Sequence, residues 1–340
     1  MRRWPAAWRL LAGLALYGVM AGAAATIENA YLVHLLILSC IFAVLVMSQN
    51  LVTGYMGLLH LCQAAFYGIG AYASALVAMK LHVGVPLACL VGTGVAAGSG
   101  LVVGVLSIRF GGHYLAIVTL GFGVIVNQIL NNWVGLTRGP MGLSGIPAPP
   151  AIRLLGLTIA WTPYTYLLGG LLLVFLTYLV LARIRDSKVG LMMEAIRENE
   201  LAAACVGIPT VRVKVAAFTL AALLAGPAGA MYAHYSLMLV PELFGFFDSA
   251  NLIAMAVLGG LGSFAGSIAS AVFFTVVPEM LRVAGEWRLV IYGGLLVVVV
   301  LFFPKGLAGL GTLVREKIAG ACGRRSSRPP IGEGEARGAP

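Results

Sequence analysis

The sequence predicts an all-α integral membrane protein with about ten transmembrane segments. Hydrophobic residues make up 60% of the 340 residues and charged residues only 10%, whereas a soluble domain carries about 25% charged residues. The 44 glycines are typical of membrane helices, which approach one another closely where side chains are small. Charged residues gather in short gaps between long apolar runs and at the two ends. A water-soluble protein of this composition could not cover its surface with polar groups.

Residues 1–30 are predicted to form a first span, with its apolar part near 10–27. Arg2, Arg3 and Arg9 precede this part, as expected of a helix that starts on the cytoplasmic side. A cleaved signal peptide has a similar basic start and a similar end of small residues. The many apolar runs that follow favour a retained helix, and cleavage would leave the orientation of the remaining spans unchanged.

The next apolar runs are long enough to cross a bilayer, which takes about 20 residues for a core of about 30 Å. Between Glu28 and Lys80 no formally charged residue occurs, and two spans are predicted there, near 31–53 and 57–79. By the same criterion, further spans are predicted near 85–107, 113–134, 163–182, 213–235 and 288–303. The intervening residues 135–162 are rich in proline and glycine and are predicted to form a long irregular loop.

The run from Ala250 to Leu281 is predicted to break into two short crossings. As one straight helix it would be about 48 Å long, and Gly259–Ser263 form a weak point for a helix. Charge supports the break, because basic residues mark cytoplasmic loops. With the break, the basic loop 183–214 and the basic C-terminal end both lie inside, whereas the acidic loop 236–249 lies outside. Both termini are therefore predicted to be cytoplasmic.

The C-terminal residues 313–340 contain few apolar side chains and are predicted to be a disordered cytoplasmic tail. Upstream, Gly68–Ala73 resembles Gly260–Ala265, and the two motifs fall in predicted segments that run in opposite directions. An inverted repeat of two halves would produce such an echo. Chance similarity between glycine-rich helices would produce it as well, and the sequence leaves both interpretations open.

Motifs for catalysis or nucleotide binding are absent from the sequence. It contains no HExxH or GxSxG pattern and no GxxxxGK followed by Ser or Thr. The five cysteines are scattered, without the paired spacing of a metal site or a disulfide framework. We therefore predict no enzyme activity, no metal site and no cofactor in this chain. The net charge of +10 lies in loops and at the ends, where it suits anionic membrane lipid rather than nucleic acid.

Polar side chains within the predicted spans are candidates for a translocation path. Gln63, Thr119 and Asn127 lie in apolar runs, together with several amides at the ends of spans. Polar groups in a bilayer must find partners, so these side chains face either a neighbouring helix or an aqueous path. We predict that Gln63, Thr119 and Asn127 line the path, and hydrogen bonding between helices is the alternative.

The loop 183–214 is the one long loop predicted on the cytoplasmic side. Asp186 or Ser187 can cap a short helix that runs through Ile196, and Asn199 can cap a second helix, which Gly207 ends. Met and Ile side chains lie on one side of these helices, and Arg and Glu side chains lie on the other. Such a pattern is typical of a docking surface, although a solvated loop on lipid headgroups would show it too.

These residues resemble a known family. The segment Gly190–Ala203, followed by Gly207-Ile208, is similar to the cytoplasmic coupling loop of branched-chain amino acid ABC-transporter permeases of the LivM type. Shorter motifs extend the similarity over nearly everything from about 30 to 310: Gly54–Gly57, Gln63–Tyr72, Tyr114–Leu120, Arg212–Lys214, Ala225–Ala230, Leu258–Ser263, Tyr292–Gly294 and Pro304–Gly309.

The resemblance implies an importer in the bacterial inner membrane. Its partners would be a second homologous permease subunit, two ATP-binding cassette subunits that hydrolyse ATP, and a periplasmic substrate-binding protein. Residues 31–312 would form the permease transmembrane domain, and 183–214 would form its coupling loop. The substrate would be a branched-chain amino acid or a related small polar solute. A stand-alone channel or secondary transporter is the alternative, but it leaves the long loop without a role.

Within the coupling loop, the resemblance assigns docking to the ATPase subunit to Glu194, Ala195, Arg197 and Glu198. Asn199 lies between the two short helices, and Gly207 ends the second one. One departure concerns the residues before Gln63, where the family usually has Ser-Leu-Gly and this chain has His60-Leu61-Cys62. These larger side chains are expected to narrow the path.

Overall fold

The computed structural model describes residues 29–108, 110, 112–149, 152–154, 157–159, 161–281 and 293–294. The predicted span near 10–27 and the predicted tail 313–340 lie outside the described residues. The predicted span near 288–303 also lies outside them, apart from residues 293–294.

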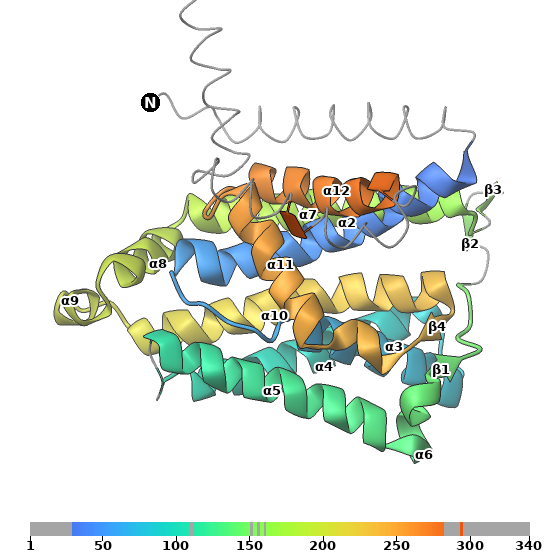
Figure 1. Ribbon diagram of the computed structural model, residues 1–340, viewed down its shortest axis with the longest axis horizontal. Coiled ribbons are helices and arrows are strands. Elements are labelled where there is room, and N and C mark those ends of the chain that lie inside the picture. Colours follow the sequence, from blue (N-terminus) through green and yellow to red (C-terminus); the bar gives the residue numbers. More distant parts are fainter. Residues whose placement is uncertain are drawn as a thin grey trace, which may run out of the picture.

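The described residues form a bundle of helices, most of which run roughly parallel to one another, while α11 crosses them at a steep angle (Figure 1). Its larger helices are α2 (Ala30–Asn50), α3 (Gln63–Lys80), α4 (Val85–Leu106), α5 (Gly112–Asn132), α7 (Pro163–Arg185), α10 (Thr210–Ser236), α11 (Phe246–Gly259) and α12 (Phe264–Met280). Five helical stretches are long and apolar enough to cross a membrane, and α11 and α12 are shorter apolar helices. The prediction of a helical, multi-pass membrane protein is confirmed.

Short elements close one end of the bundle, at the right of Figure 1. After α5 the chain forms α6 (Val134–Thr137), the 3-10 turn η2 (Gly139–Met141) and the strand β1 (Leu143–Ser144). β1 pairs antiparallel with β4 (Met238–Leu239), which follows α10. The strands β2 (Ile152–Leu154) and β3 (Leu157–Ile159) form a second antiparallel pair. The predicted irregular loop 135–162 therefore contains short regular elements.

The start of α3 differs from the prediction. α2 continues into a π-helical turn, η1 (Leu51–Tyr55), and residues 56–62 are then not helical. They lead from the end of α2 back into the bundle, so that α3 begins inside it (Figure 1). Gly57 has a φ of 68°, which favours glycine and ends the helical geometry. The predicted span 57–79 thus begins as a re-entrant segment, defined here as residues 56–62.

The predicted outer loop 236–249 also differs, because much of it folds inward as β4, the 3-10 turn η3 (Pro241–Phe244) and the first turn of α11. Phe244 is buried, and its ring centroid lies 5.1 Å from that of Tyr67 and 5.7 Å from that of Tyr72, both on α3. A Cβ at Gly68 would meet the Phe244 side chain at 2.7 Å. The glycine therefore makes room for η3 to pack inside the bundle.

The predicted break in the run 250–281 is confirmed. α11 ends at Gly259, and α12 begins at Phe264. Between them Gly260 and Gly262 have φ values of 96° and 84°, which residues with a side chain rarely adopt. The side chain of Ser263 then accepts a hydrogen bond from the Gly266 amide and caps α12.

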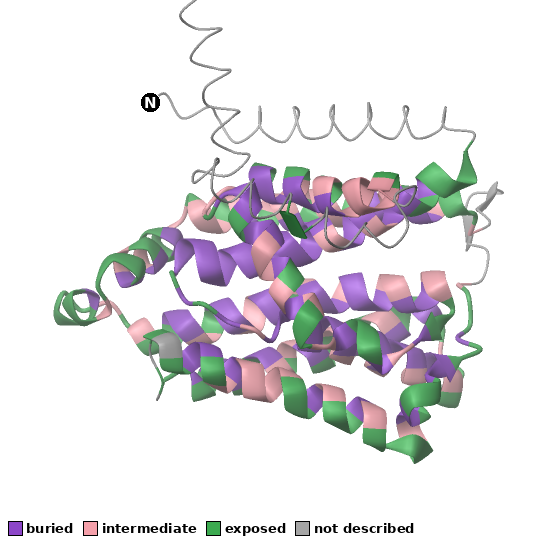
Figure 2. Ribbon diagram, viewed as in Figure 1, coloured by how far each residue is buried: buried purple, intermediate pink, exposed green. Residues whose placement is uncertain are grey.

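Two sets of three helices pack in the same pattern. α10 packs against α3 and α4, and α3 packs against α4; likewise α2 packs against α11 and α12, and α11 packs against α12. Burial follows these contacts and concentrates on the facing sides of the helices (Figure 2). Small residues let the backbones approach, because a Cβ on Gly70 would meet the Gly226 Cα at 2.7 Å.

The motif echo found in the sequence does not match this packing pattern. Gly68–Ala73 lies inside α3, whereas Gly260–Ser263 forms the turn before α12. The two motifs therefore occupy different kinds of local structure.

Candidate coupling loop and polar centre

Two short helices, α8 (Lys188–Glu198) and α9 (Glu200–Cys205), project from the end of the bundle opposite the strands (Figure 1). The Ser187 side chain accepts a hydrogen bond from the Val189 amide and caps α8. The Asn199 side chain accepts one from the Ala202 amide and caps α9. The chain turns at Gly207 with a φ of 88°. The predicted helices, their caps and their glycine stop are confirmed.

The predicted docking residues lie on different faces of α8. Gly190, Met193 and Ile196 are buried against the bundle, as the amphipathic pattern requires. Ala195 is partly buried and packs against the same core. Glu194, Arg197, Glu198 and Asn199 are all exposed. The carboxylates of Glu194 and Glu198 are therefore at the surface of the chain.

Arg197 also reaches the bundle. Its guanidinium donates a hydrogen bond of 2.7 Å to the backbone carbonyl of Gly54, in the π-helical turn η1. A Cβ at Gly57 would lie 2.9 Å from the Arg197 Cγ, so the arginine stem lies against the start of the re-entrant segment. This side chain joins the coupling loop to the transmembrane helices rather than only extending outward.

A second link joins α9 to α10. Lys214 on α10 forms an ion pair with Glu200 on α9, and the Lys214 side chain is only 3% exposed whereas that of Glu200 is 40% exposed. An unpaired ammonium group at such a buried position would be costly. The pair therefore fixes the first turn of α9 against the start of α10.

Asn50, at the end of α2, holds the turn between α11 and α12. It is fully buried; its Nδ2 donates to the Ser267 Oγ at 2.8 Å and to the Gly260 carbonyl at 3.2 Å. Its Oδ1 accepts a hydrogen bond of 2.9 Å from the Gly262 amide. The Tyr55 hydroxyl also donates to the Gly262 carbonyl, at 2.7 Å. These contacts give a glycine turn the partners that its own helices cannot provide.

Gly54 makes this arrangement possible. A Cβ at this position would overlap the Asn50 Oδ1 and would lie 2.5 Å from the Gly262 nitrogen. The π-helical turn thus brings three features together in one place: the Arg197 hydrogen bond, the Asn50 side chain and the α11–α12 turn. π-helical turns are rare and occur often at functional sites.

A buried polar network surrounds the re-entrant segment. The Gln63 Nε2 donates to the Ser48 Oγ at 2.5 Å, and its Oε1 lies 3.3 Å from the His60 Nε2. The Gln49 Nε2 donates to the Thr53 Oγ1 and to the His60 carbonyl, both at 3.1 Å. The side chains of Gln63, His60, Gln49 and Ser48 are all fully buried within this chain.

Thr119 and Asn127, on α5, bind the two inward-folded segments. The Thr119 Oγ1 accepts a hydrogen bond of 3.1 Å from the Leu61 amide and is fully buried. The Asn127 Nδ2 donates at 2.7 Å to the Pro241 carbonyl in η3, and Asn127 is partly exposed. The structure thus brings Gln63 and Thr119 to the re-entrant segment, whereas Asn127 lies at η3. Their lining of a path stays a prediction.

The structure shows hydrogen bonds of three residues to which the sequence assigned no role: Asn50, Tyr55 and Ser249. In the sequence, Asn50 is one of several amides at the ends of predicted spans. The glycine turn is the signal that could have linked it to Gly262, because the backbone groups of such a turn need hydrogen-bond partners from elsewhere. Ser249 lay in the predicted outer loop, yet its Oγ accepts a hydrogen bond of 3.1 Å from the Ala64 amide. No local pattern in the sequence indicates that contact.

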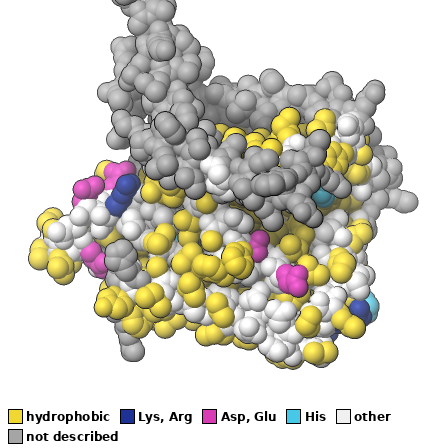
Figure 3. Space-filling view, viewed as in Figure 1, with side chains coloured by type: hydrophobic (Ala, Val, Ile, Leu, Met, Phe, Trp, Pro, Cys, Tyr) yellow, Lys and Arg dark blue, Asp and Glu magenta, His cyan; other side chains and the backbone are white. Residues whose placement is uncertain are grey.

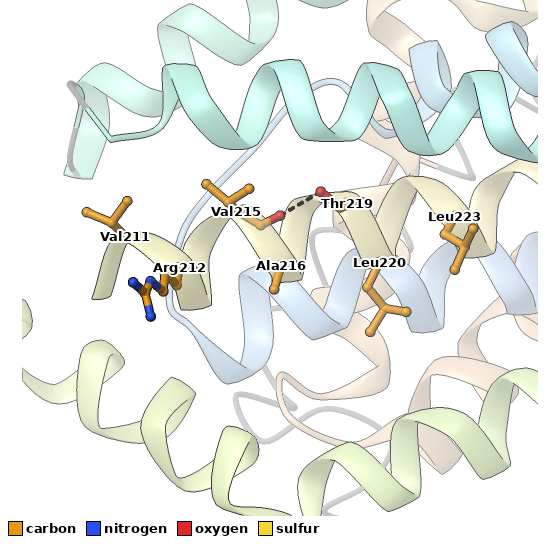
Figure 4. Close-up of a pocket in the computed structure, with 7 residues that line it drawn as sticks. All are labelled: Val211, Arg212, Val215, Ala216, Thr219, Leu220 and Leu223. Atoms are coloured by element: carbon orange, nitrogen blue, oxygen red, sulfur yellow. Dashed lines mark hydrogen bonds between the residues drawn. The ribbon is translucent and has the colours of Figure 1, made fainter. Parts of the chain in front are cut away.

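A groove of about 490 Å³ runs along the start of α10. Figure 4 shows its seven lining residues, which all lie on α10: Val211, Arg212, Val215, Ala216, Thr219, Leu220 and Leu223. Arg212 is the one charged residue of this lining. The Thr219 hydroxyl is the other polar group, and it donates within the helix to the Val215 carbonyl. The groove therefore offers mainly an apolar surface. Among the described residues, no group of three or more His, Cys, Asp or Glu could hold a metal ion.

Comparison with known proteins gives a matching family and several similar proteins. A family described as "Branched-chain amino acid transport system / permease component" matches residues 31–300. The high-affinity branched-chain amino acid transport system permease protein LivM of Salmonella typhimurium is 36% identical over 296 residues, which cover 79% of this chain and 68% of LivM; LivM of Escherichia coli gives the same values. The LivH permease protein of Salmonella typhimurium is 24% identical over 281 residues, which cover 79% of this chain and 91% of LivH. No solved structure matches the chain significantly.

Proposed function

Because the chain belongs to the branched-chain amino acid transport system permease family, we propose that it carries branched-chain amino acids or related small polar solutes across the bacterial inner membrane as part of an ATP-driven importer. The chain is the permease component and not the ATPase. The relatives LivM and LivH, named as permease proteins of high-affinity branched-chain amino acid transport systems, support the substrate class.

The observation that carries the proposal is the geometry of the coupling loop. α8 and α9 stand outside the bundle and are tied to it by Arg197 and Lys214, while Glu194 and Glu198 are exposed. A helix pair held in this way can receive a push from a separate ATPase subunit and pass it to the membrane helices. Glu194, Ala195, Arg197, Glu198 and Asn199 form the proposed contact region.

The proposed complex contains two ATP-binding cassette subunits, a second homologous permease subunit and a periplasmic substrate-binding protein, all within or beside membrane lipid. Two relatives of different type, LivM and LivH, both resemble this chain, which supports a pair of related permeases. The binding protein would select the substrate, so this chain would need few specific contacts with it.

We further propose about ten membrane segments in two inverted halves, with both termini in the cytoplasm. The related packing of α10 with α3 and α4, and of α2 with α11 and α12, supports two halves. α2 ends, and α10 begins, at the same end of the bundle, beside α8 and α9. The two sets of helices therefore run in opposite directions, as an inverted repeat requires.

For the translocation path we propose Gln63, Thr119 and Asn127. They hold the re-entrant segment and η3, the two stretches where the backbone leaves helical geometry inside the bundle. Irregular backbone at membrane depth is tolerated where it is buried in protein or lines a water-filled cavity. Tilting of the helices during the ATP cycle would expose these polar side chains in turn.

The test is the charge reversal Glu194→Lys on the exposed face of α8. The ATPase should then co-purify poorly with the permease, and ATP-dependent uptake into vesicles should fall, while the chain still inserts. Lys80→Glu reverses a charge at the end of α3, far from α8 along the bundle, and should leave both the co-purification of the ATPase and the uptake unchanged. Normal assembly and uptake in Glu194→Lys, and also in a chain with residues 192–206 scrambled, would favour a stand-alone channel or secondary transporter.

A further inference from the structure

Carboxylates interrupt one otherwise apolar side of the bundle. Figure 3 shows acidic side chains in the middle of a largely hydrophobic surface, over the region of α11 and η3. Glu242 is exposed and Asp248 is partly exposed. Phe246 and Phe247 beside them are 43% and 80% exposed. We name Asn127, Glu242, Phe246, Phe247 and Asp248 the acidic face.

The acidic face lies at membrane depth. Ser249, the residue after Asp248, accepts a hydrogen bond from the Ala64 amide at the beginning of α3. At the helical rise, Ala64 lies about 24 Å along α3 from its last residue, Lys80. Asn127 binds the Pro241 carbonyl from within α5. Asp248 is therefore inside the span of the surrounding helices and not in an outer loop.

An ionisable group at this depth is out of place against lipid. Acidic side chains in membrane segments almost always face the interior of an assembly or a watery cavity. α4 differs, because its exposed large side chains are all apolar: Leu87, Leu90, Val91, Val95, Leu101, Val102, Val105 and Leu106. The two sides of the bundle thus differ in chemistry at the same depth.

Gly245 lies beside both Asn127 and the Asp248 carboxylate. A Cβ on Gly245 would lie 3.9 Å from both the Asn127 Nδ2 and the Asp248 Oδ2. Gly245 has a φ of −86° and a ψ of −176°, an extended backbone that any residue adopts, so the backbone conformation does not demand glycine. The Asn127 amide and the Asp248 carboxylate, both on partly exposed residues, thus adjoin the same glycine.

We propose that the acidic face is the surface that meets the second permease subunit, with Asp248 at the boundary between the two. This inference rests on the proposed function, since it needs a partner permease. Charge selects the partner: a second copy of this chain, related by a two-fold axis, would present the same carboxylates, and like charges in an apolar interface repel. A homologous permease with donors or basic groups opposite Glu242 and Asp248 fits instead.

The test is photo-crosslinking in the assembled importer, in membrane vesicles. We expect Phe247→p-benzoylphenylalanine to form a covalent adduct with the partner permease and Val95→p-benzoylphenylalanine on α4 to form none. The adduct is identified by its mass and by peptides from both chains. An adduct from position 95 but not from position 247 would overturn the proposal. So would a reaction of position 247 only with its own chain, with lipid or with a second copy.

A change of charge at position 248 tests the proposal independently of the crosslinking. Asp248→Lys should reduce the amount of partner permease that co-purifies, whereas the charge reversal Lys80→Glu at the end of α3 should not. If Asp248→Lys leaves co-purification intact, the acidic face is not the interface. Co-purification of the ATPase and uptake by the unmodified importer test the proposed function itself. A working importer without an adduct at position 247 would refute only the present inference.

Discussion

Arg197 and Gly54, 143 residues apart in the sequence, are joined by a hydrogen bond of 2.7 Å from guanidinium to backbone carbonyl. The bond links the coupling helix α8 to the π-helical end of α2. From there Asn50 and Tyr55 reach the turn between α11 and α12 through Gly262. One unbroken set of contacts therefore connects the exposed loop with α2, α11 and α12.

Replacement of Arg197 by lysine should uncouple ATP hydrolysis from transport. Lysine keeps the charge but not the planar guanidinium geometry. A hydrogen bond from a charged group contributes about 1.5–3 kcal/mol, and about 1.4 kcal/mol corresponds to tenfold. We expect normal co-purification of the ATPase and roughly tenfold less uptake per ATP hydrolysed. Arg183→Lys at the end of α7 is the control, and an unchanged ratio in Arg197→Lys would contradict the role in coupling.

Gly54→Ala should destabilise the protein more than Gly98→Ala on α4 does. The added methyl group would overlap the Asn50 Oδ1 and approach the Gly262 nitrogen, and overpacking of this kind costs about 1–3 kcal/mol. Gly98→Ala places its methyl group where no atom lies within 4 Å. In a helix it should be neutral or should stabilise by up to about 1 kcal/mol. The midpoints of thermal unfolding in detergent compare the two variants. Equal midpoints would show that the turn between α11 and α12 can move to accommodate the methyl group at position 54.

Glu200→Gln should release α9 from the bundle. Lys214 would keep its charge at a position with only 3% exposure, and an unpaired buried charge is destabilising. Hydrogen exchange of the α9 amides should accelerate, with Glu198→Gln on the exposed face of α8 as the control. The double change Glu200→Gln with Lys214→Met should restore slow exchange, because it removes the buried charge. Slow exchange in the single variant would mean that packing alone holds α9.

Cysteines at positions 63 and 127 should report on the path, in a chain whose native cysteines are replaced. Asn127 is partly exposed and Gln63 is fully buried in this chain. We expect a cysteine at 127 to react with small water-soluble thiol reagents, and one at 63 to react only in some nucleotide states. Ser267→Cys, on α12 beside Asn50, should stay unreactive because this position is fully buried. If neither position 63 nor 127 reacts in any state, both residues serve packing.

The sequence predicted the elements that depend on local properties. Apolar length placed α2, α4, α5, α7 and α10, and capping chemistry placed α8 and α9 through Ser187 and Asn199. The break before Phe264 followed from glycine content together with the alternation of charge. These signals act within a few residues of the structure that they produce.

The inward-folded stretches could not be predicted in this way. Residues 236–249 carry Pro241, Glu242 and Asp248, which interrupt the apolar runs as a loop between spans would, yet Phe244 packs into the space left by Gly68. Residues 56–62 are apolar enough to extend a helix, but the partners of His60 and Leu61 come from α2 and α5. Both depend on contacts between segments that are distant in the sequence.

The Asn50 contact has a consequence for biosynthesis. Asn50 enters the membrane early, but its partner Gly262 lies 212 residues further along the chain. At a translation rate of about 5–20 residues per second, roughly 10 to 40 s pass before that turn emerges. During this interval the Asn50 amide has to bind water, lipid headgroups or a provisional partner within the translocon. The end of α2 therefore acquires its native partners only after the second half of the polypeptide has been made.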